Sequence, residues 1–405
     1  MSICSRGIFS ADKALALVFF LLPSTLVYPE SAFAQTKNQG SKTSCGKPFE
    51  RALVVSGGGI APGLALGVIA GAKDAGYKPD VIMTTCGASI GGAINNSYQD
   101  PKKAKEYLTS REFHRHLLSL AKVSKKKDAF TGEIRNLGAE ELGAKLGMAQ
   151  LNKGKIPNIF TGNLLDVPQT LPRMLPRQDF ARSPNEPKLV IVAARANFQP
   201  KDVGGSKNSN VLYEQTFFTD PKTAKHLHEI PASMKQNFPD SPIHATTVAK
   251  TGLSTLQAAR ASIADPFLID PAKIGEDYYF AGAMDLFPIE SAQTIACNVA
   301  ITKPSGEYTM LEDMAVTNGF GFSQSERIKQ LDRYKGLRWI DMKGASEFAM
   351  DPDTDGMDLV SRVPTDYEQF KALVEKQYDF GYDRTRNAME GSPTAPANQR
   401  RPVAR

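Results

Sequence analysis

Residues 51–63 read RALVVSGGGIAPG and residues 81–92 read VIMTTCGASIGG, and these two stretches decide the fold. Each begins with a short run of β-branched and other apolar residues, which is typical of a buried strand. Between them, residues 64–76 carry apolar side chains at helical spacing. A strand, a glycine turn, a helix and a second strand form a βαβ unit, which favours a parallel sheet with helices on both faces.

The rest of the chain continues this alternation of strands and helices. Two further buried strands are predicted at residues 188–193 and 298–302. Helices are predicted at residues 102–122, 254–263, 324–334 and 366–378. We therefore predict an α/β protein with a mainly parallel central sheet.

The composition is that of an ordinary globular protein. The chain has 405 residues, of which 41% are hydrophobic and 23% charged, which excludes wholesale disorder, a fibrous repeat and a polytopic membrane protein. Lys and Arg number 49 against 43 Asp and Glu, a net charge of +6. This excess is mild for the length, so no nucleic-acid partner is expected.

The N-terminus has the features of a signal peptide, predicted at residues 1–34. Basic residues precede an apolar run at residues 14–22, and small residues at positions 32 and 34 suit signal peptidase. An uncleaved membrane anchor is the alternative, but the run is short and Pro23 interrupts it. The protein is therefore expected to be exported, either to the periplasm or out of the cell.

One folded domain is predicted in the mature chain. Residues 35–48 are polar and turn-rich, which is typical of a linker, and residues 391–405 have too little apolar surface to fold. Between them, residues 49–390 contain no clear linker and are predicted to form one domain. Removal of the signal would leave Cys45, Cys86 and Cys297, of which Cys45 could pair with either of the others.

The first chemical motif is the pentapeptide Gly87-Ala88-Ser89-Ile90-Gly91, which directly follows the second strand. In a nucleophile elbow, a serine lies on a tight turn from strand to helix, and the flanking glycines let the two elements approach without a Cβ clash. The small residues after the pentapeptide can begin such a helix. Ser89 is therefore the predicted nucleophile.

The second motif is a glycine run at residues 57–59, at the end of the first strand. Backbone N–H groups in such a loop can point at an anion, and the N-terminus of the following helix adds partial positive charge. A dinucleotide site is the poorer alternative, because Pro62 breaks the G-x-G-x-x-G register. An oxyanion hole suits a serine elbow one strand later. The predicted donors are the N–H groups of Gly57, Gly58, Gly59 and Ile90.

The chain lacks the late histidine of a Ser-His-Asp triad. The last of its five histidines is His244, whereas the α/β-hydrolase order places the histidine base after the acid, near the end of the chain. The two H-x-H pairs come with no carboxylate or cysteine pattern that completes a metal site. The sequence therefore favours a carboxylate as the partner of Ser89, with no metal ion and no cofactor.

These motifs resemble those of the patatin-like phospholipases. The matching pieces are the glycine loop, the serine pentapeptide, residues 258–267 (AARASIADPF) and residues 279–288 (YFAGAMDLFP). The resemblance implies a three-layer α/β/α fold, a Ser–Asp dyad without histidine and a glycine-loop oxyanion hole. It also implies hydrolysis of acyl esters in phospholipids or related lipids.

This sequence departs from the family at the second catalytic residue. The family's Asp-Gly-Gly/Ala reads here as Ala281-Gly282-Ala283, and the glycine loop carries Ala61-Pro62 where a basic residue is usual. Asp285 is predicted to serve instead, in a shifted dyad, and Asp277 is the poorer candidate. The alternative is a catalytically silent lipid- or membrane-binding protein that kept the pocket and lost the base.

Two other stretches suggest binding. Residues 111–122 (REFHRHLLSLAK) predict a basic amphipathic helix, which could lie on an anionic membrane surface or pack on the domain. Residues 351–356 (DPDTDG) match the first half of a calcium-binding loop, but Arg362 stands where a bidentate Glu is required. An acidic turn is the better interpretation of the second stretch.

Overall fold

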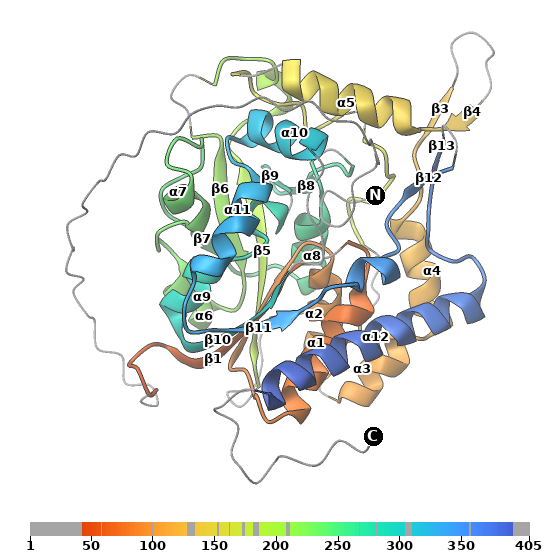
Figure 1. Ribbon diagram of the computed structural model, residues 1–405. Coiled ribbons are helices and arrows are strands. Elements are labelled where there is room, and N and C mark those ends of the chain that lie inside the picture. The colour runs from red at the N-terminus through yellow and green to blue at the C-terminus, as the bar shows by residue number, and fades with distance from the viewer. Residues whose placement is uncertain are drawn as a thin grey trace, which may run out of the picture.

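A computed structural model describes residues 43–57, 59–98, 100–127, 134–151, 154–161, 163–171, 175–180, 186–207, 211–266, 268–280, 282–303, 310–355 and 358–391 (Figure 1). The predicted signal peptide, most of the linker and all but the first residue of the predicted tail lie outside these ranges. Within the described residues, no helix is both long and apolar enough to cross a membrane.

A twisted, mostly parallel sheet forms the centre of the molecule, in the strand order β11-β10-β1-β2-β5-β6-β7. The strands from β11 to β5 are parallel, β6 runs antiparallel to β5, and β9 pairs with β5 and β8. In the strands' register, Ala52 lies between Val81 and Val299. The strands are β1 (Phe49–Val55), β2 (Val81–Thr85), β3 (Lys125–Lys127), β4 (Ile134–Asn136), β5 (Lys188–Ala196), β6 (Tyr213–Phe218), β7 (Val248–Lys250), β8 (Ala272–Ile274), β9 (Asp277–Phe280), β10 (Ala296–Lys303), β11 (Leu337–Asp341), β12 (Asp353–Asp355) and β13 (Asp358–Val360).

Helices cover both faces of this sheet. The α-helices are α1 (Pro62–Asp74), α2 (Ala88–Ser97), α3 (Pro101–Leu108), α4 (Arg111–Leu120), α5 (Ala139–Leu151), α6 (Pro221–Leu227), α7 (Ser233–Asn237), α8 (Thr255–Ile263), α9 (Ile289–Ile295), α10 (Met310–Phe320), α11 (Gln324–Gln330) and α12 (Tyr367–Glu390). Short 3₁₀ turns are η1 (Pro200–Asp202), η2 (Gly282–Asp285), η3 (Leu331–Arg333) and η4 (Ala345–Phe348).

The strand side chains alternate between two separate apolar cores. Along β1, Ala52 and Val54 belong to one core, and Leu53 and Val55 to the other. A strand that is apolar at every position is the expected sequence of a sheet covered on both faces. The predicted α/β class and the three-layer α/β/α arrangement are confirmed.

The C-terminal helix α12 lies alongside α1, and both are easily found in Figure 1 as the blue and orange helices. Glycines allow the close approach, because a Cβ on Gly67 would lie 2.0 Å from the Tyr378 carbonyl oxygen and one on Gly381 would lie 2.4 Å from that of Leu64. The sequence predicted this helix only as far as residue 378, whereas α12 continues to Glu390.

The single helix predicted at residues 102–122 is two helices, and that prediction was wrong. The break falls at Thr109-Ser110, because the Ser110 side chain accepts the Phe113 N–H and caps a new helix, α4. The apolar side of α4 faces the protein interior, where Phe113, Leu117 and Leu120 are buried. The basic segment therefore packs its apolar side on the domain, while Arg111 and Arg115 are exposed.

One disulfide ties the N-terminal segment to the sheet. Cys45 is bonded to Cys297 in β10, with their Cα atoms 5.7 Å apart, and Cys86 is buried and is not part of this disulfide. Of the two pairings that the sequence left open, the structure contains the one with Cys297. The bond joins residues 252 positions apart in the chain, so it restrains the unfolded chain strongly.

Candidate active site

The predicted elbow lies where β2 turns into α2. Cys86, the first residue after β2, has a φ of 49°, a left-handed conformation that makes the turn tight. The next position requires glycine, because a Cβ on Gly87 would lie 1.8 Å from the Gly59 carbonyl oxygen. Ser89 is then the second residue of α2, in the partly positive first turn of that helix, and its side chain is completely buried.

The Ser89 hydroxyl donates a hydrogen bond to another serine. The Ser89 Oγ lies 2.9 Å from the Oγ of Ser262, in α8. The Ser262 hydroxyl also accepts the Cys86 N–H at 2.9 Å and donates to the Val192 carbonyl oxygen at 2.6 Å. The Ser262 hydroxyl therefore uses its one donor proton and both of its acceptor sites. Ser262 therefore positions the elbow but offers no base for the Ser89 proton.

Ser262 lies within the segment at residues 258–267 that resembles the family, but nothing in the sequence predicted a role for it. Its contact with Ser89 depends on α8 lying against α2, a packing of elements far apart in the chain. A buried serine near the end of a helix carries no local signal that identifies such a partner.

The glycine loop packs directly against the elbow, but its N–H groups have different uses. The Gly57 N–H donates to the Thr85 side chain at 2.8 Å, so Gly57 anchors the loop to β2 and does not present a free donor. Gly59 has a φ of 77°, which favours glycine. The Ile60 N–H donates to a carboxylate oxygen of Asp351 at 2.7 Å. Gly58 lies outside the described residues.

Ile90, the fourth predicted donor, lies in the first turn of α2. Its N–H makes a long bond of 3.3 Å to the Gly87 carbonyl oxygen. Ile90 and Gly59 line the same pocket as Cys86 and Gly87, so the structure brings these two predicted donors together at the elbow. Ile60 was not among the predicted donors, and the hydrogen bond from its N–H to a carboxyl oxygen adds it to the set.

The pocket beside the elbow is narrow and mainly apolar, with a volume of about 50 Å³. Two acidic residues, Asp265 and Asp351, also line it. The apolar lining residues include Ile90, Leu117, Leu120, Leu165, Ile263, Leu268 and Ile269. Such a lining suits a hydrocarbon chain, because apolar surface is favourably removed from water there.

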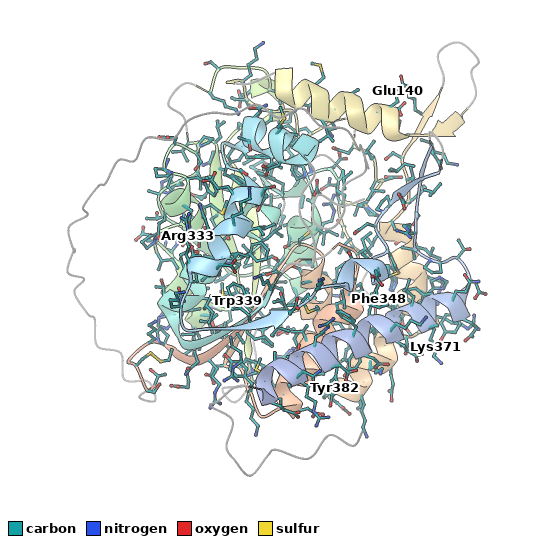
Figure 2. All side chains as sticks on the ribbon, in the orientation of Figure 1. Glu140, Arg333, Trp339, Phe348, Lys371 and Tyr382 are labelled. Atoms are coloured by element: carbon teal, nitrogen blue, oxygen red, sulfur yellow. A yellow bond between two sulfur atoms is a disulfide. The ribbon has the colours of Figure 1, made fainter. Side chains whose placement is uncertain are left out.

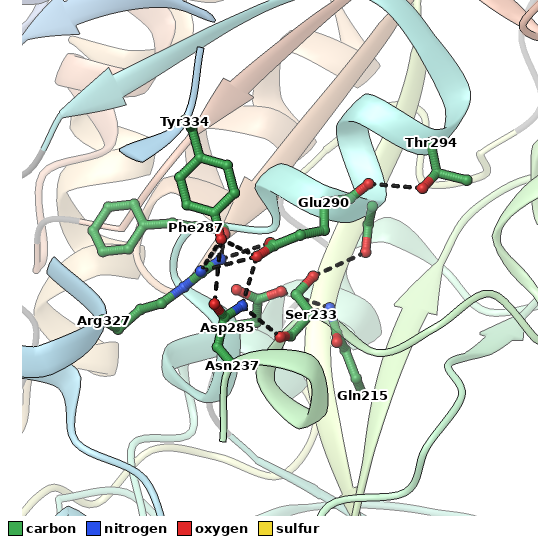
Figure 3. A network of polar contacts seen from close by, with 10 residues as sticks. Gln215, Ser233, Asn237, Asp285, Phe287, Glu290, Thr294, Arg327 and Tyr334 are labelled. Atoms are coloured by element: carbon green, nitrogen blue, oxygen red, sulfur yellow. Dashed lines mark hydrogen bonds and ion pairs between the residues drawn. The ribbon is translucent and has the colours of Figure 1, made fainter. Parts of the chain in front are cut away.

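Asp285 lies in a different, buried polar network (Figure 3). It ends η2, and its Oδ2 accepts the Gln215 side-chain N–H at 2.7 Å. Its Oδ1 is buried and within the geometric limits makes no hydrogen bond to the described residues, although the nearby Ser233 side chain acts to lower the pKa of Asp285. Burial raises the pKa of Asp285 to about 7, while the Arg327 guanidinium opposes that increase.

The centre of this network is a buried ion pair. Arg327 donates to both carboxylate oxygens of Glu290, at 3.0 and 2.7 Å, and to the Phe287 carbonyl oxygen at 2.9 Å. Burial acts to raise the pKa of Glu290, but Arg327 outweighs it and holds that pKa below its usual range. Tyr334 donates to Glu290 and completes the cluster in Figure 3.

The predicted contact between Ser89 and Asp285 is therefore not made in this structure. The main chain does come close, because the Thr85 hydroxyl donates to the Leu286 carbonyl oxygen at 3.4 Å. The turn of η2, however, directs Leu286 toward the glycine loop and the Asp285 carboxylate toward Gln215. Asp277 lies farther out, near Arg195 and Lys250 at 3.6 and 3.8 Å.

No group of three or more His, Cys, Asp or Glu side chains in the described part of the chain could hold a metal ion. The acidic stretch that resembled half of a calcium loop contributes β12, which forms a hairpin with β13. The Asp353 side chain pairs there with Arg362 at 3.3 Å.

Comparisons with known proteins identify the family to which the chain belongs. The family model described as patatin-like phospholipase matches residues 53–292, more than half of the chain. Among solved structures, the chain is similar to VipD from Legionella pneumophila, with 15% sequence identity and a TM-score of 0.31 over 87% of this chain and 69% of that one. A comparison with curated proteins gave no match.

Proposed function

This chain belongs to the patatin-like phospholipase family, and from that premise we propose that it is a serine lipid acyl hydrolase of the phospholipase A or esterase type. The family acts on phospholipids and related lipids. The observation that carries the proposal is Ser89 in the first turn of α2, beside a glycine loop and an apolar pocket. These parts are a nucleophile, an anion site and a place for an acyl chain.

In the proposed reaction, the Ser89 Oγ attacks the acyl carbonyl carbon and passes its proton to a carboxylate. Backbone N–H groups of Gly59, Ile60 and Ile90 stabilise the negative oxygen of the tetrahedral intermediate, aided by the N-terminus of α2. The C–O bond to the alcohol then breaks, and the alcohol leaves with the proton. Water attacks the acyl-enzyme in the same way and releases the fatty acid.

Asp285 is the carboxylate that we propose as the base. A pKa of about 7 suits a base that works near neutral pH, because the group is then half ionised and still accepts a proton readily. Its buried Oδ1, which makes no hydrogen bond to the described residues, and the proximity of η2 to β2 support this assignment. The proposal requires the Asp285 side chain to leave Gln215 and reach Ser89 in the substrate complex.

A catalytically silent lipid-binding protein on the same fold is the second candidate. The observation that favours it is the hydrogen bond from Ser89 to Ser262, which leaves the nucleophile without a carboxylate partner in this state. The two candidates share the apolar pocket and differ in whether a carboxylate reaches Ser89.

The test is hydrolysis of a medium-chain nitrophenyl ester and of phosphatidylcholine vesicles by the purified protein. Ser89→Ala should lower the rate by at least about a thousandfold, because the nucleophile is lost. Asp285→Asn should lower it by roughly 10²–10⁴-fold, because the base is lost. Asp277→Asn is the matched control, since it removes a carboxylate from the same segment that lies near surface cations, and it should keep the parent rate.

Two other outcomes would contradict parts of this proposal. A rate lost only in Ser89→Ala would place the base away from Asp285. A folded parent protein that hydrolyses neither substrate but still binds the vesicles would favour the silent candidate.

We also propose that the protein works outside the cytoplasm. The predicted signal at residues 1–34 motivates this, and the Cys45–Cys297 disulfide supports it, since such bonds persist mainly in oxidising compartments. Its lipid partners would then be acyl-ester lipids, and an anionic membrane surface remains part of the proposal.

A further inference from the structure

A carboxylate already lies on the glycine loop. Asp351, in the segment between η4 and β12, is 6% exposed, and its Oδ1 accepts the Ile60 N–H at 2.7 Å. Its Oδ2 lies only 1.9 Å from where a Cβ on Gly59 would be. The loop therefore needs glycine at position 59 to admit this oxygen, and in this structure it holds the carboxyl group of Asp351.

The segment that carries Asp351 is held in place from two sides. The Met350 N–H donates to the Ile60 carbonyl oxygen at 3.0 Å, so the segment bonds to both the N–H and the carbonyl group of Ile60. The buried Gln377 of α12 donates to the Phe348 carbonyl oxygen at 2.7 Å and accepts the Gly63 N–H at 3.1 Å. Phe348 lies against α12 in Figure 2, with its ring centroid 5.2 Å from that of Phe380.

The same segment narrows the pocket of the elbow. Asp351 and Pro352 line the cavity with Gly59, Gly87 and Ile90, and Ser89 beside them has no exposed surface. A carboxylate and the oxyanion of a tetrahedral intermediate carry the same charge. Because they would compete for the same N–H group, both cannot occupy the loop at once.

We infer that Asp351 is a built-in inhibitor, whose carboxylate fills the oxyanion site of the glycine loop and keeps the active site closed until residues 350–352 move away. The inference rests on the proposed function for its catalytic consequence alone. Whether the Asp351 carboxylate occupies the loop does not depend on the proposed function and can be measured without any substrate.

The experiment compares the parent protein with Asp351→Ala and Asp351→Asn. Asp353→Asn is the matched control, because Asp353 is an acidic residue two positions away that pairs with Arg362. Amide hydrogen exchange of the peptide covering residues 56–66 reports on the Ile60 N–H. The rate at which a fluorophosphonate labels Ser89 reports on access to the nucleophile, with Ser89→Ala as the blank. A thermal melt of each variant confirms that it is folded.

We expect exchange in the loop to accelerate roughly tenfold to a hundredfold in Asp351→Ala, as the loss of a charge-assisted hydrogen bond implies. Labelling of Ser89 should accelerate by a similar factor, and the Asp353→Asn control should match the parent in both. Both rates in Asp351→Asn should fall between those of the parent protein and of Asp351→Ala, since asparagine keeps an acceptor oxygen but loses the charge.

Unchanged exchange in a folded Asp351→Ala would overturn the inference, because the loop would then not be held by this side chain. Slower labelling in both Asp351 variants would also overturn it and make Asp351 a working part of the site. Faster exchange with no labelling of any variant would support occupancy of the loop by Asp351 and refute the proposed hydrolase.

Discussion

The two buried regions around Ser89 and Asp285 are close in space, because η2 contacts β2, but they are built differently. The hydrogen bonds of Ser89 and Ser262 join only neutral hydroxyl and backbone groups, although Asp265 and Asp351 line the adjoining pocket, and the Ser262 hydroxyl is fully used. Around Asp285, a buried Glu290–Arg327 pair sets the local charge. Neutral hydrogen bonds hold the Ser89 side chain in place, whereas a neighbouring ion pair adjusts the pKa of the Asp285 carboxyl group. Catalysis by a dyad requires the two regions to meet.

The largest effect on stability is expected from Arg327→Met. This change leaves the mostly buried Glu290 carboxylate without its cation, and breaking a buried pair by removing one member costs roughly 3–5 kcal/mol. The pKa of Asp285 should rise further, because Arg327 is the cation that lowers it. Urea unfolding measures the first effect, and the pH dependence of any esterase activity measures the second. A loss of less than about 1 kcal/mol would show that the network contributes little.

The second-largest effect is a change in the free energy of unfolding with pH, which the ionisation of Asp285 causes. Its pKa is raised to about 7 in the folded protein, against about 3.9 for a free aspartate. The folded state therefore binds the extra proton, so this contribution is fully present below about pH 4 and is lost as the pH rises through 7. The loss should amount to a few kcal/mol between pH 4 and 8.

The check is to measure the free energy of unfolding across this pH range for the parent protein and Asp285→Asn. The parent should lose stability relative to the variant as the pH rises, because the asparagine does not ionise. Parallel curves for the two proteins would mean that Asp285 titrates normally, and the two regions would then differ less than their contacts indicate.

The smallest effect is expected from Ser262→Ala, on the neutral side of the comparison. The change leaves the buried Cys86 N–H without its acceptor, which should cost about 1–3 kcal/mol, with no dependence on pH between 5 and 8. Ser262→Thr keeps the hydroxyl and serves as the control for its loss. A pH-dependent cost in Ser262→Ala would show that the serine site is coupled to a titrating group after all.

Much of the fold was predictable because local patterns agreed with it. The predicted strand at residues 51–56 corresponds to β1, and the glycine pattern around Ser89 marked a tight turn that the structure contains. Ser110 was the local signal missed in the predicted long helix, since it caps α4. For the site, local patterns placed Ser89 in a strand-to-helix turn, but they did not indicate that Ser262 contacts Ser89 or that the Asp285 carboxylate lies on Gln215.

The sequence by itself determined the α/β class, the elbow and the glycine loop, because each depends on residues close together in the chain and on periodicities that sterics impose. Only the tertiary structure decided that Ser262 bonds to Ser89, that Asp285 faces Gln215 and that Asp351 lies on Ile60. These pairs are separated by 173, 70 and 291 positions in the chain. Which of several buried polar residues meet is settled by how whole helices and strands pack, since each buried group must find its partner within that arrangement.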